Sequence, residues 1–152
     1  MVPPVSLRPI GLLRTPFRTL AECPRNGRQP KPAPPCEARL FPEFGPGLAS
    51  LDGFSHLIVL YWLGGAHEPA LIVTPPFDSA PRGVFATRSP RRPNPIGLSV
   101  VAFDGFADPL TLRLRFLDCV DGTPLLDIKP YLPSTDSVPE AKMGWLAPHR
   151  TG

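Results

Sequence analysis

The sequence predicts a mainly β protein, a single-domain β-barrel with proline-rich loops, and three observations lead to this prediction. The chain has 152 residues, enough for one domain with a hydrophobic core, which we place at residues 1–152. Proline makes up 24 of these residues, and proline is excluded from helix interiors and from central strands. Short apolar runs alternate with proline-rich segments along the chain. Short strands joined by stiff loops fit these observations, and closing the strands into a barrel removes exposed edges.

The first half of the chain contains three of the predicted strands. Residues 5–14 form the first strand, and residues 36–41 form the second. Between them, residues 15–35 hold too many prolines for a helix. Residues 43–53 are expected to form a turn or a single helical turn. Residues 54–63 are apolar on both alternating faces, which is typical of a strand buried on both sides.

The second half contributes three more strands, at residues 98–103, 110–117 and 125–128. The middle strand alternates cleanly, so its apolar side chains are expected to point inward and its polar side chains outward. Residues 130–152 carry few apolar side chains and are expected to wrap the surface. In the middle strand the inward set is Leu110, Leu112, Leu114 and Phe116, and the outward set is Thr111, Arg113 and Arg115.

The overall charge mildly favours an anionic partner such as RNA, because the chain carries a net charge of +3 and has a pI near 9.0. The N-terminus has no apolar stretch of signal-peptide length, and no run approaches the roughly 20 residues that a membrane span needs. Cys23, Cys36 and Cys119 are odd in number and lack CxxC spacing, which argues against zinc and against a disulfide framework. We therefore expect a soluble cytoplasmic protein with three free thiols, no metal and no membrane contact.

Residues 83–97 (GVFATRSPRRPNPIG) combine stiffness with positive charge. Three residues precede a proline here, and a residue in that position is pushed out of the α region, so the segment should be extended before any ligand arrives. Arg88, Arg91 and Arg92, with Arg82 just upstream, supply planar donors suited to phosphate or carboxylate. The alternative is a solvated turn between two strands, and for Arg91 taken singly exposure to solvent is the expected state.

Two further clusters carry polar side chains that could contribute to a site. Residues 23–30 place Arg28 and Gln29 in a segment flanked by prolines, and taken alone this is an ordinary basic loop. Asp127 and Lys129 lie two residues apart on an extended chain, so they point to the same face. They fit either a plain salt bridge or a general base with the cation that tunes it.

Five segments stand out together, namely residues 10–17 (IGLLRTPF), 23–29 (CPRNGRQ), 51–63 (LDGFSHLIVLYWL), 83–101 (GVFATRSPRRPNPIGLSVV) and 121–133 (DGTPLLDIKPYLP). They resemble the TrmO family, also called the TsaA-like or YaeB-like family, over about residues 5–146. The resemblance implies a β-barrel protein that uses S-adenosylmethionine. It implies N6-methylation of the threonylcarbamoyl-modified adenosine next to the anticodon in threonine tRNA. It also implies a homodimer with the cofactor near the subunit contact.

The resemblance further implies that S-adenosylmethionine lies where several loops converge. Contacts are expected from the loop after the first strand, from the exit of the strand at 54–63, from the proline-rich segment and from the chain around residue 116. Within the proline-rich segment, Arg88 is expected nearest the cofactor. By motif position the cofactor-binding residues are Arg28, Gln29, Gly64, Gly65, Phe85, Ala86, Thr87, Arg88, Gly97, Leu98, Arg115, Phe116, Leu117 and Asp118.

The chemistry that the resemblance implies is a single in-line transfer of a methyl group from sulfonium to nitrogen, helped mainly by positioning. An N6 that already bears a carbonyl is a poor nucleophile because its lone pair is delocalised, so removing its proton during transfer would help. Asp127 is the candidate catalytic base. Lys129 and Tyr131 are expected to orient the acceptor or to help bind RNA.

The chain departs from the family pattern in two ways. The more common pattern has Asn where this chain has Arg91. Several bacterial members also carry an additional C-terminal domain. If that domain binds tRNA, this protein would bind tRNA weakly, bind it with the help of a partner, or act on another substrate. The alternatives are a module that senses S-adenosylmethionine without methyl transfer, a methyltransferase of the same fold that acts on a small molecule, and a barrel without a ligand.

Overall fold

A computed structural model describes residues 1–65 and 67–149. The contacts divide the chain into two compact units. The barrel unit comprises Met1–Ala66 and Pro95–Tyr131, and the second unit comprises His67–Asn94 and Leu132–Gly152. Each unit has its own strands and its own packed side chains.

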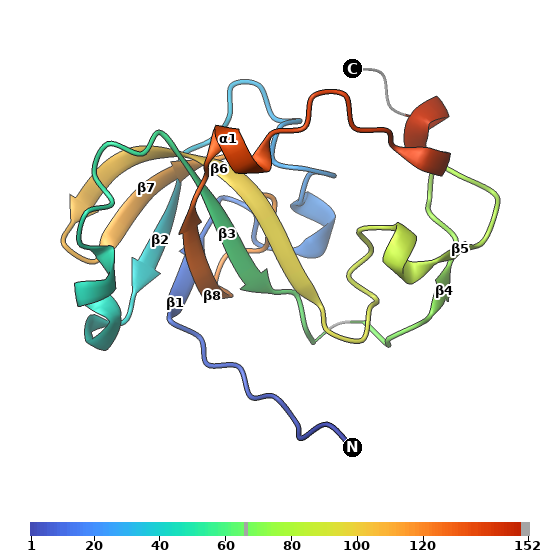
Figure 1. Cartoon of the computed structure of the whole chain (residues 1–152), viewed down its shortest axis with the longest axis horizontal. Coiled ribbons are helices and arrows are strands. Elements are labelled where there is room, and N and C mark those ends of the chain that lie inside the picture. Colours follow the sequence, from blue (N-terminus) through green and yellow to red (C-terminus); the bar gives the residue numbers. More distant parts are fainter. Residues whose placement is uncertain (66, 150–152) are drawn as a thin grey trace. The chain divides into compact units, whose positions relative to one another are not determined.

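The barrel unit is a closed barrel of six antiparallel strands (Figure 1), which confirms the predicted mainly β architecture. Strand β8 pairs with β3 on one side and with β1 on the other, and this double pairing closes the sheet. Two short 3-10 helices, η1 (Leu20–Glu22) and η2 (Pro42–Leu48), lie in its loops. In order around the barrel the strands are β1 (Gly11–Arg14), β2 (Cys36–Leu40), β7 (Thr111–Arg115), β6 (Ile96–Asp108), β3 (His56–Trp62) and β8 (Thr123–Pro130).

The second unit contains a two-stranded sheet of β4 (Ile72–Val73) and β5 (Arg82–Gly83), which continues into the 3-10 helix η3 (Val84–Ala86). It also contains the short helix α1 (Pro133–Asp136) and the 3-10 helix η4 (Gly144–His149). Within this unit, Trp145 of η4 stacks on Phe77, with ring centroids 6.0 Å apart. The Arg82 guanidinium lies 4.6 Å from the Trp145 ring centroid and also binds Asp78. An aromatic and ionic cluster therefore holds this unit together.

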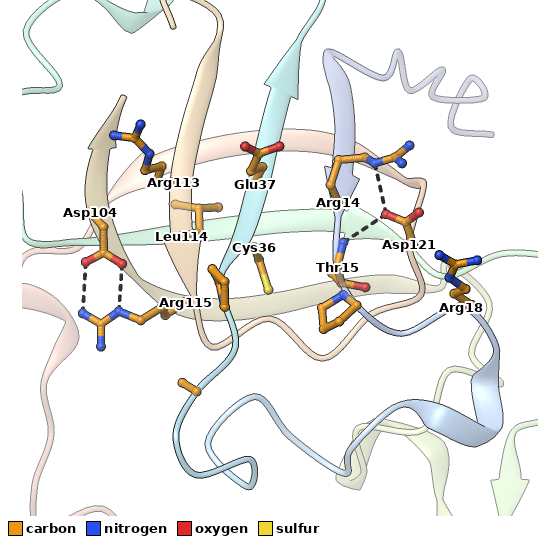
Figure 2. Close-up of a pocket in the computed structure, with 13 residues that line it drawn as sticks. Arg14, Thr15, Arg18, Cys36, Glu37, Asp104, Arg113, Leu114, Arg115 and Asp121 are labelled. Atoms are coloured by element: carbon orange, nitrogen blue, oxygen red, sulfur yellow. Dashed lines mark hydrogen bonds and ion pairs between the residues drawn. The ribbon is translucent and has the colours of Figure 1, made fainter. Parts of the chain in front are cut away.

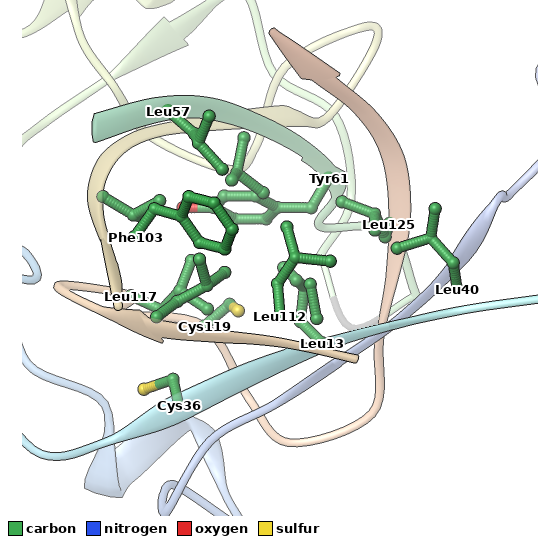
Figure 3. Close-up of a cluster of buried hydrophobic side chains, with 14 of the residues drawn as sticks. Leu13, Cys36, Leu40, Leu57, Tyr61, Phe103, Leu112, Leu117, Cys119 and Leu125 are labelled. Carbon is green, nitrogen blue, oxygen red and sulfur yellow. The ribbon is translucent and has the colours of Figure 1, made fainter. Parts of the chain in front are cut away.

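Leucine dominates the interior of the barrel (Figure 3). Leu13, Leu57, Leu112 and Leu125 come from four different strands, and all are 0% exposed. The predicted inward direction of Leu112 and Leu114 is confirmed, and Arg113 is exposed as expected. The core thus rests on side chains that alternate inward along each strand.

Two residues of the segment 110–117 differ from the predicted alternation. Thr111 was expected outward but is 6% exposed, and its burial costs little because its hydroxyl binds the Asp108 carboxylate. Phe116 was expected inward but adopts a φ of 80°, which ends the strand at Arg115. Leu117 takes the inward position instead and is 1% exposed.

The strand predicted at residues 54–63 is observed as β3, but it is not buried on both sides. Leu57, Val59 and Tyr61 are buried, whereas the residues between them are only partly buried. The closed sheet explains the difference, because one face of each strand lines the interior and the other faces outward.

Other strand boundaries also differ from the prediction. The first strand begins at Gly11 and not at residue 5, since Pro9 has no N–H to donate to a ladder. Strand β6 extends to Asp108 and does not stop at residue 103. A register shift lies between Phe103 and Phe106, and Gly105 there has a φ of 89°. A bulge at this glycine lets the strand bend and continue.

In the described part of the chain, no helix is long and apolar enough to cross a membrane. The same residues contain no group of three or more histidine, cysteine, aspartate or glutamate side chains placed to hold a metal ion.

Replacing Leu112 by alanine should lower the free energy of unfolding by about 2–5 kcal/mol, because the fully buried side chain leaves a cavity. Leu7→Ala is the matched control, since Leu7 is 50% exposed and its loss should change stability by less than about 0.5 kcal/mol. Urea unfolding followed by circular dichroism measures both values. Equal effects of the two substitutions would contradict the assignment of Leu112 to the core.

Two of the three cysteines are buried in the barrel unit. Burial raises the pKa of Cys36 to about 11 and that of Cys119 to about 12, from an ordinary value of 9.0. Cys23 is only partly buried. In the folded state the two buried thiols therefore stay protonated at a pH where the unfolded chain ionises them.

The free energy of unfolding should consequently fall as the pH rises above 9, because unfolding then releases protons from Cys36 and Cys119. Well below pH 9, where the thiols are protonated in both the folded and the unfolded state, they contribute no pH dependence. Cys119→Ala should make the fall between pH 9 and 11 shallower, by up to about 1.4 kcal/mol per pH unit. Denaturant titrations across this range test the slope. Cys23→Ala is the control, and an effect on the slope as large as that of Cys119→Ala would refute the assignment.

Candidate functional site

The loop of residues 23–30 packs directly on Phe116 within the barrel unit. The Arg28 guanidinium lies 4.0 Å from the centroid of the Phe116 ring. Gly27 is buried, and a side chain there would collide with the Phe116 backbone. The structure therefore brings together two of the predicted cofactor-binding segments, around Arg28 and around Phe116. The Gln29 side chain serves its own loop, because its Oε1 accepts a hydrogen bond from the backbone N–H of Arg25 at 2.5 Å.

A buried hydrogen-bond network holds Asp118 in place. The Tyr61 hydroxyl lies 2.7 Å from Ser99 Oγ and donates to Asp118 Oδ1 at 2.9 Å. Tyr61 is 2% exposed, and its pKa is raised above the ordinary range by burial first and by the Asp118 carboxylate second. The hydroxyl therefore stays protonated and available to Asp118 at neutral pH.

Gly97 provides the space for this tyrosine. It lies opposite Tyr61 in the β3–β6 pair, and a side chain on Gly97 would collide with the Tyr61 ring. A continuous series of contacts thus runs from Gly97 through Tyr61 to Asp118. Tyr61 and Ser99 are not among the site residues predicted from the sequence. The signal was the alternation of Tyr61 with Val59 in β3 and of Ser99 with Gly97 and Val101 in β6, which puts both polar side chains on the inward face, where each needs a partner.

The exit of β3 places Gly64 and Gly65 beside the start of β6. Leu63 N–H donates to the carbonyl oxygen of Pro95 at 2.7 Å, so the two segments lie side by side. Gly65 has a φ of 111°, a conformation that favours glycine, and a side chain on Gly64 would collide with the Trp62 indole. These glycines let the backbone turn closely past Trp62.

The candidate base lies on the outer face of β8. Asp127 Oδ2 is 3.0 Å from Lys129 Nζ, and the two side chains are 45% and 58% exposed. The shared face predicted for them is confirmed. Tyr131 follows on the same strand exit, where its ring contacts His56 edge-on with centroids 6.4 Å apart.

One register row connects the candidate base with a predicted cofactor residue. Leu60 of β3 lies opposite Leu98 of β6 on one side and opposite Asp127 of β8 on the other. Adjacent strands are about 4.8 Å apart, so Leu98 and Asp127 lie about 10 Å apart on one face. Leu98 is 47% exposed. An outward-facing apolar side chain and a carboxylate are thus held at fixed spacing.

The remaining predicted contacts, Phe85 to Arg88, belong to the second unit. Arg92 Nη1 donates to the carbonyl oxygens of Thr87 and Ser89 at 2.9 and 3.2 Å. Trp145 Nε1 donates to the carbonyl oxygen of Ala86 at 2.9 Å. Phe85 is 75% exposed, and Arg88 is exposed as well. The backbone carbonyl oxygens of this segment are therefore held by hydrogen bonds, whereas the side chains of Phe85 and Arg88 are exposed to solvent.

The expectation that the arginines of this segment face an anionic partner is wrong for Arg82 and Arg92, and for the exposed Arg88 it stays a prediction. Arg92 turns back onto its own loop, and Arg82 binds Asp78 with its Nη2 2.8 Å from Oδ2. Arg91 is exposed as expected and donates to the Glu68 carbonyl oxygen at 3.2 Å. Arg91 and Arg92 donate to backbone carbonyl oxygens and Arg82 donates to the Asp78 carboxylate, so these three guanidinium groups brace the loop. Convergence of this loop with the barrel residues stays a prediction.

Gly97→Ala should lower the free energy of unfolding by about 1–3 kcal/mol, because the added methyl group displaces the buried Tyr61 ring. Gly47→Ala is the control, since nothing lies within 4 Å of a methyl group there. That change should be neutral or stabilise the fold by up to about 1 kcal/mol. Thermal unfolding followed by circular dichroism compares the two. A Gly97→Ala protein as stable as the parent would show that Tyr61 does not need this space.

Comparisons with known proteins agree with this arrangement. Residues 12–137 match the model of the tRNA-methyltransferase O N-terminal domain. A probable S-adenosyl-L-methionine-binding protein of Archaeoglobus fulgidus is 49% identical over 93% of this chain, which spans 38% of that protein. A tRNA (adenine(37)-N6)-methyltransferase of Escherichia coli is 40% identical over 90% of this chain, and the chain spans 61% of its length.

Solved structures show the same fold. A crystal structure of TrmO matches 93% of this chain with a TM-score of 0.76 and 38% identity. TrmO from Pseudomonas aeruginosa matches 93% with a TM-score of 0.75 and 37% identity. This chain covers 64% and 62% of those two chains. From the family model, these relatives and the closed barrel, we conclude that the chain belongs to the TrmO family.

Proposed function

We propose that this protein is an S-adenosylmethionine-dependent methyltransferase that modifies N6 of an adenosine next to the anticodon of tRNA, with threonylcarbamoyl-adenosine as its acceptor. The observation that carries the proposal is the series of contacts in the barrel unit that joins separate motif segments. Arg28 packs on Phe116, and Asp118 binds Tyr61, which packs on Gly97. Arg28, Tyr61 and Gly97 lie in segments that carry the family resemblance, and Phe116 and Asp118 are among the predicted cofactor-binding residues. The fold brings them together although they lie far apart in sequence.

The chemistry of these residues suits the proposed cofactor. S-adenosylmethionine supplies an activated methyl group when bound and carries a carboxylate, an ammonium, sugar hydroxyls and an adenine ring. Arg28 offers a cation for the carboxylate, and Asp118 offers an acceptor for a hydroxyl or an ammonium. Leu98 offers an exposed apolar surface for the adenine ring. The Tyr61 hydroxyl fixes the orientation of Asp118 before the cofactor arrives, which lowers the entropy lost on binding.

Asp127 is proposed as the base that takes the proton from the acceptor N6 as the methyl group arrives. Its carboxylate is partly exposed, so an acceptor base can reach it, and the Lys129 ammonium holds it at 3.0 Å. Lys129 and Tyr131 are proposed to orient the acceptor. The row through Leu60 keeps Asp127 at a fixed distance from Leu98. The acceptor at the base is thereby positioned relative to a cofactor that packs on Leu98, and in-line transfer depends on such positioning.

A second candidate function is binding of S-adenosylmethionine without methyl transfer. It is favoured by the names of relatives from Archaeoglobus fulgidus and Methanothermobacter thermautotrophicus, which are described as binding proteins or probable binding proteins. A homodimer and a cytoplasmic location come from the family resemblance and from the proposed substrate. Both stay predictions.

Purified protein incubated with methyl-labelled S-adenosylmethionine and total tRNA should transfer label to adenosine, which nucleoside analysis detects. Binding of the cofactor by calorimetry without any transfer would favour the binding-only function. Absence of both would refute the proposal.

Asp127→Asn should reduce the rate of methyl transfer by about 100-fold or more, as expected for loss of a general base, with the dissociation constant of S-adenosylmethionine unchanged. Glu43→Gln is the control, because Glu43 is an exposed carboxylate that pairs with Arg8 at 3.6 Å and lies outside the proposed site. A near-normal rate for Asp127→Asn, with normal cofactor binding, would remove Asp127 as the base.

A further inference from the structure

An open pocket of about 710 Å³ lies on the outside of the barrel, over β1, β2 and β7 and the loop after β1 (Figure 2). Four arginines line it, namely Arg14, Arg18, Arg113 and Arg115. We call this surface the arginine pocket. Of these four arginines, only Arg115 is among the cofactor-binding residues that the sequence predicts.

The sheet register sets the spacing of these charges. Arg14 of β1 lies opposite Glu37 of β2, and Glu37 lies opposite Arg113 of β7. The three residues thus form one row across neighbouring strands on the outer face. Because strands are about 4.8 Å apart, Arg14 and Arg113 lie about 10 Å apart. Two residues along β7, Arg115 continues the same face.

Each carboxylate in the arginine pocket is bound by its own arginine. Asp104 accepts two hydrogen bonds from Arg115, at 2.7 and 3.0 Å, and this guanidinium holds the pKa of Asp104 below its ordinary value. Asp121 lies 3.1 Å from Arg14 Nε. Glu37 lies 2.8 Å from Arg39, which is on the same strand.

Among the residues that the structure describes, the guanidinium groups of Arg18 and Arg113 form no ion pair with a carboxylate, although the backbone N–H of Arg18 donates to the Glu22 carboxylate at 2.7 Å. Arg113 Nη1 donates to the Phe106 carbonyl oxygen at 3.0 Å, which fixes the side chain and leaves other donors free. Both residues are exposed. The four arginines that line the pocket outnumber its three carboxylates, Glu37, Asp104 and Asp121, so the lining carries a net positive charge.

We infer that the arginine pocket binds the sugar–phosphate backbone of the RNA substrate, an inference that rests on the function proposed above. Guanidinium forks match phosphate oxygens, and contacts to phosphates position a nucleic acid without reading its sequence. The pocket is open, and a spacing of about 7–10 Å between neighbouring cations on the sheet suits successive phosphates of a chain better than one small ligand. The ion pairs with Asp104 and Asp121 hold Arg115 and Arg14 in place before RNA arrives.

The test measures binding of total tRNA to Arg18→Gln, Arg113→Gln and the double variant over a range of salt concentrations. Each substitution should weaken binding roughly threefold, the range expected of an exposed ion pair. Each should also reduce the slope of log affinity against log salt by about one, because one fewer counterion is released. The KM for tRNA should rise while the dissociation constant of S-adenosylmethionine stays unchanged.

Arg8→Gln is the matched control, since Arg8 is 75% exposed and pairs with Glu43 outside the arginine pocket. Circular dichroism melting verifies that all variants fold. Affinity and salt slope equal to those of the parent would overturn the inference, and so would a parent protein that binds no tRNA. If the parent binds tRNA through Arg18 and Arg113 but transfers no methyl group, the inference stands and the proposed function fails.

Discussion

Closure of the barrel by β8 is the constraint on which the other features depend. Because β8 pairs with both β3 and β1, every strand has one inward and one outward face, and neither face can shift without breaking a ladder. The inward face supplies the leucine core. The outward face carries two rows of functional interest, Leu98–Leu60–Asp127 and Arg14–Glu37–Arg113. Both rows therefore owe their spacing to the same closed sheet.

Tyr61 connects the core to the proposed cofactor site. Its ring is part of the buried cluster and fills the space above Gly97, while its hydroxyl binds Asp118. A substitution that loosens the packing around this ring would also release Asp118, so stability and cofactor affinity are coupled here. Such coupling is expected where one buried side chain serves both packing and a polar network.

Much of the fold could be predicted from the sequence, because proline content and the alternation of Leu112 and Leu114 are local signals. The errors lie where tertiary structure overrides a local signal. The alternation of apolar residues predicts that Phe116 points inward. Its positive φ ends this alternation, and Leu117 is buried in the core instead. The strand predicted at residues 98–103 ends before Gly105, but in the structure this glycine lies in a bulge and β6 continues past it.

The candidate site was accessible from the sequence only in part. Motif resemblance indicated Arg28 and Asp118, and spacing indicated that Asp127 and Lys129 share a face. Tyr61 was hidden among apolar neighbours, since its role depends on a partner 57 residues away. The arginine pocket was equally hidden, because its row arises from strands that are far apart in sequence.

The two tryptophans of the chain fall one in each unit. Trp62 ends β3 beside Gly64, and Trp145 stacks on Phe77 and binds the Ala86 carbonyl oxygen. Their indole fluorescence therefore offers two independent optical reporters, each next to a different stretch of the proposed cofactor site. Exchanging either tryptophan for phenylalanine leaves a single emitter, so ligand-induced changes in emission can be assigned to one unit at a time.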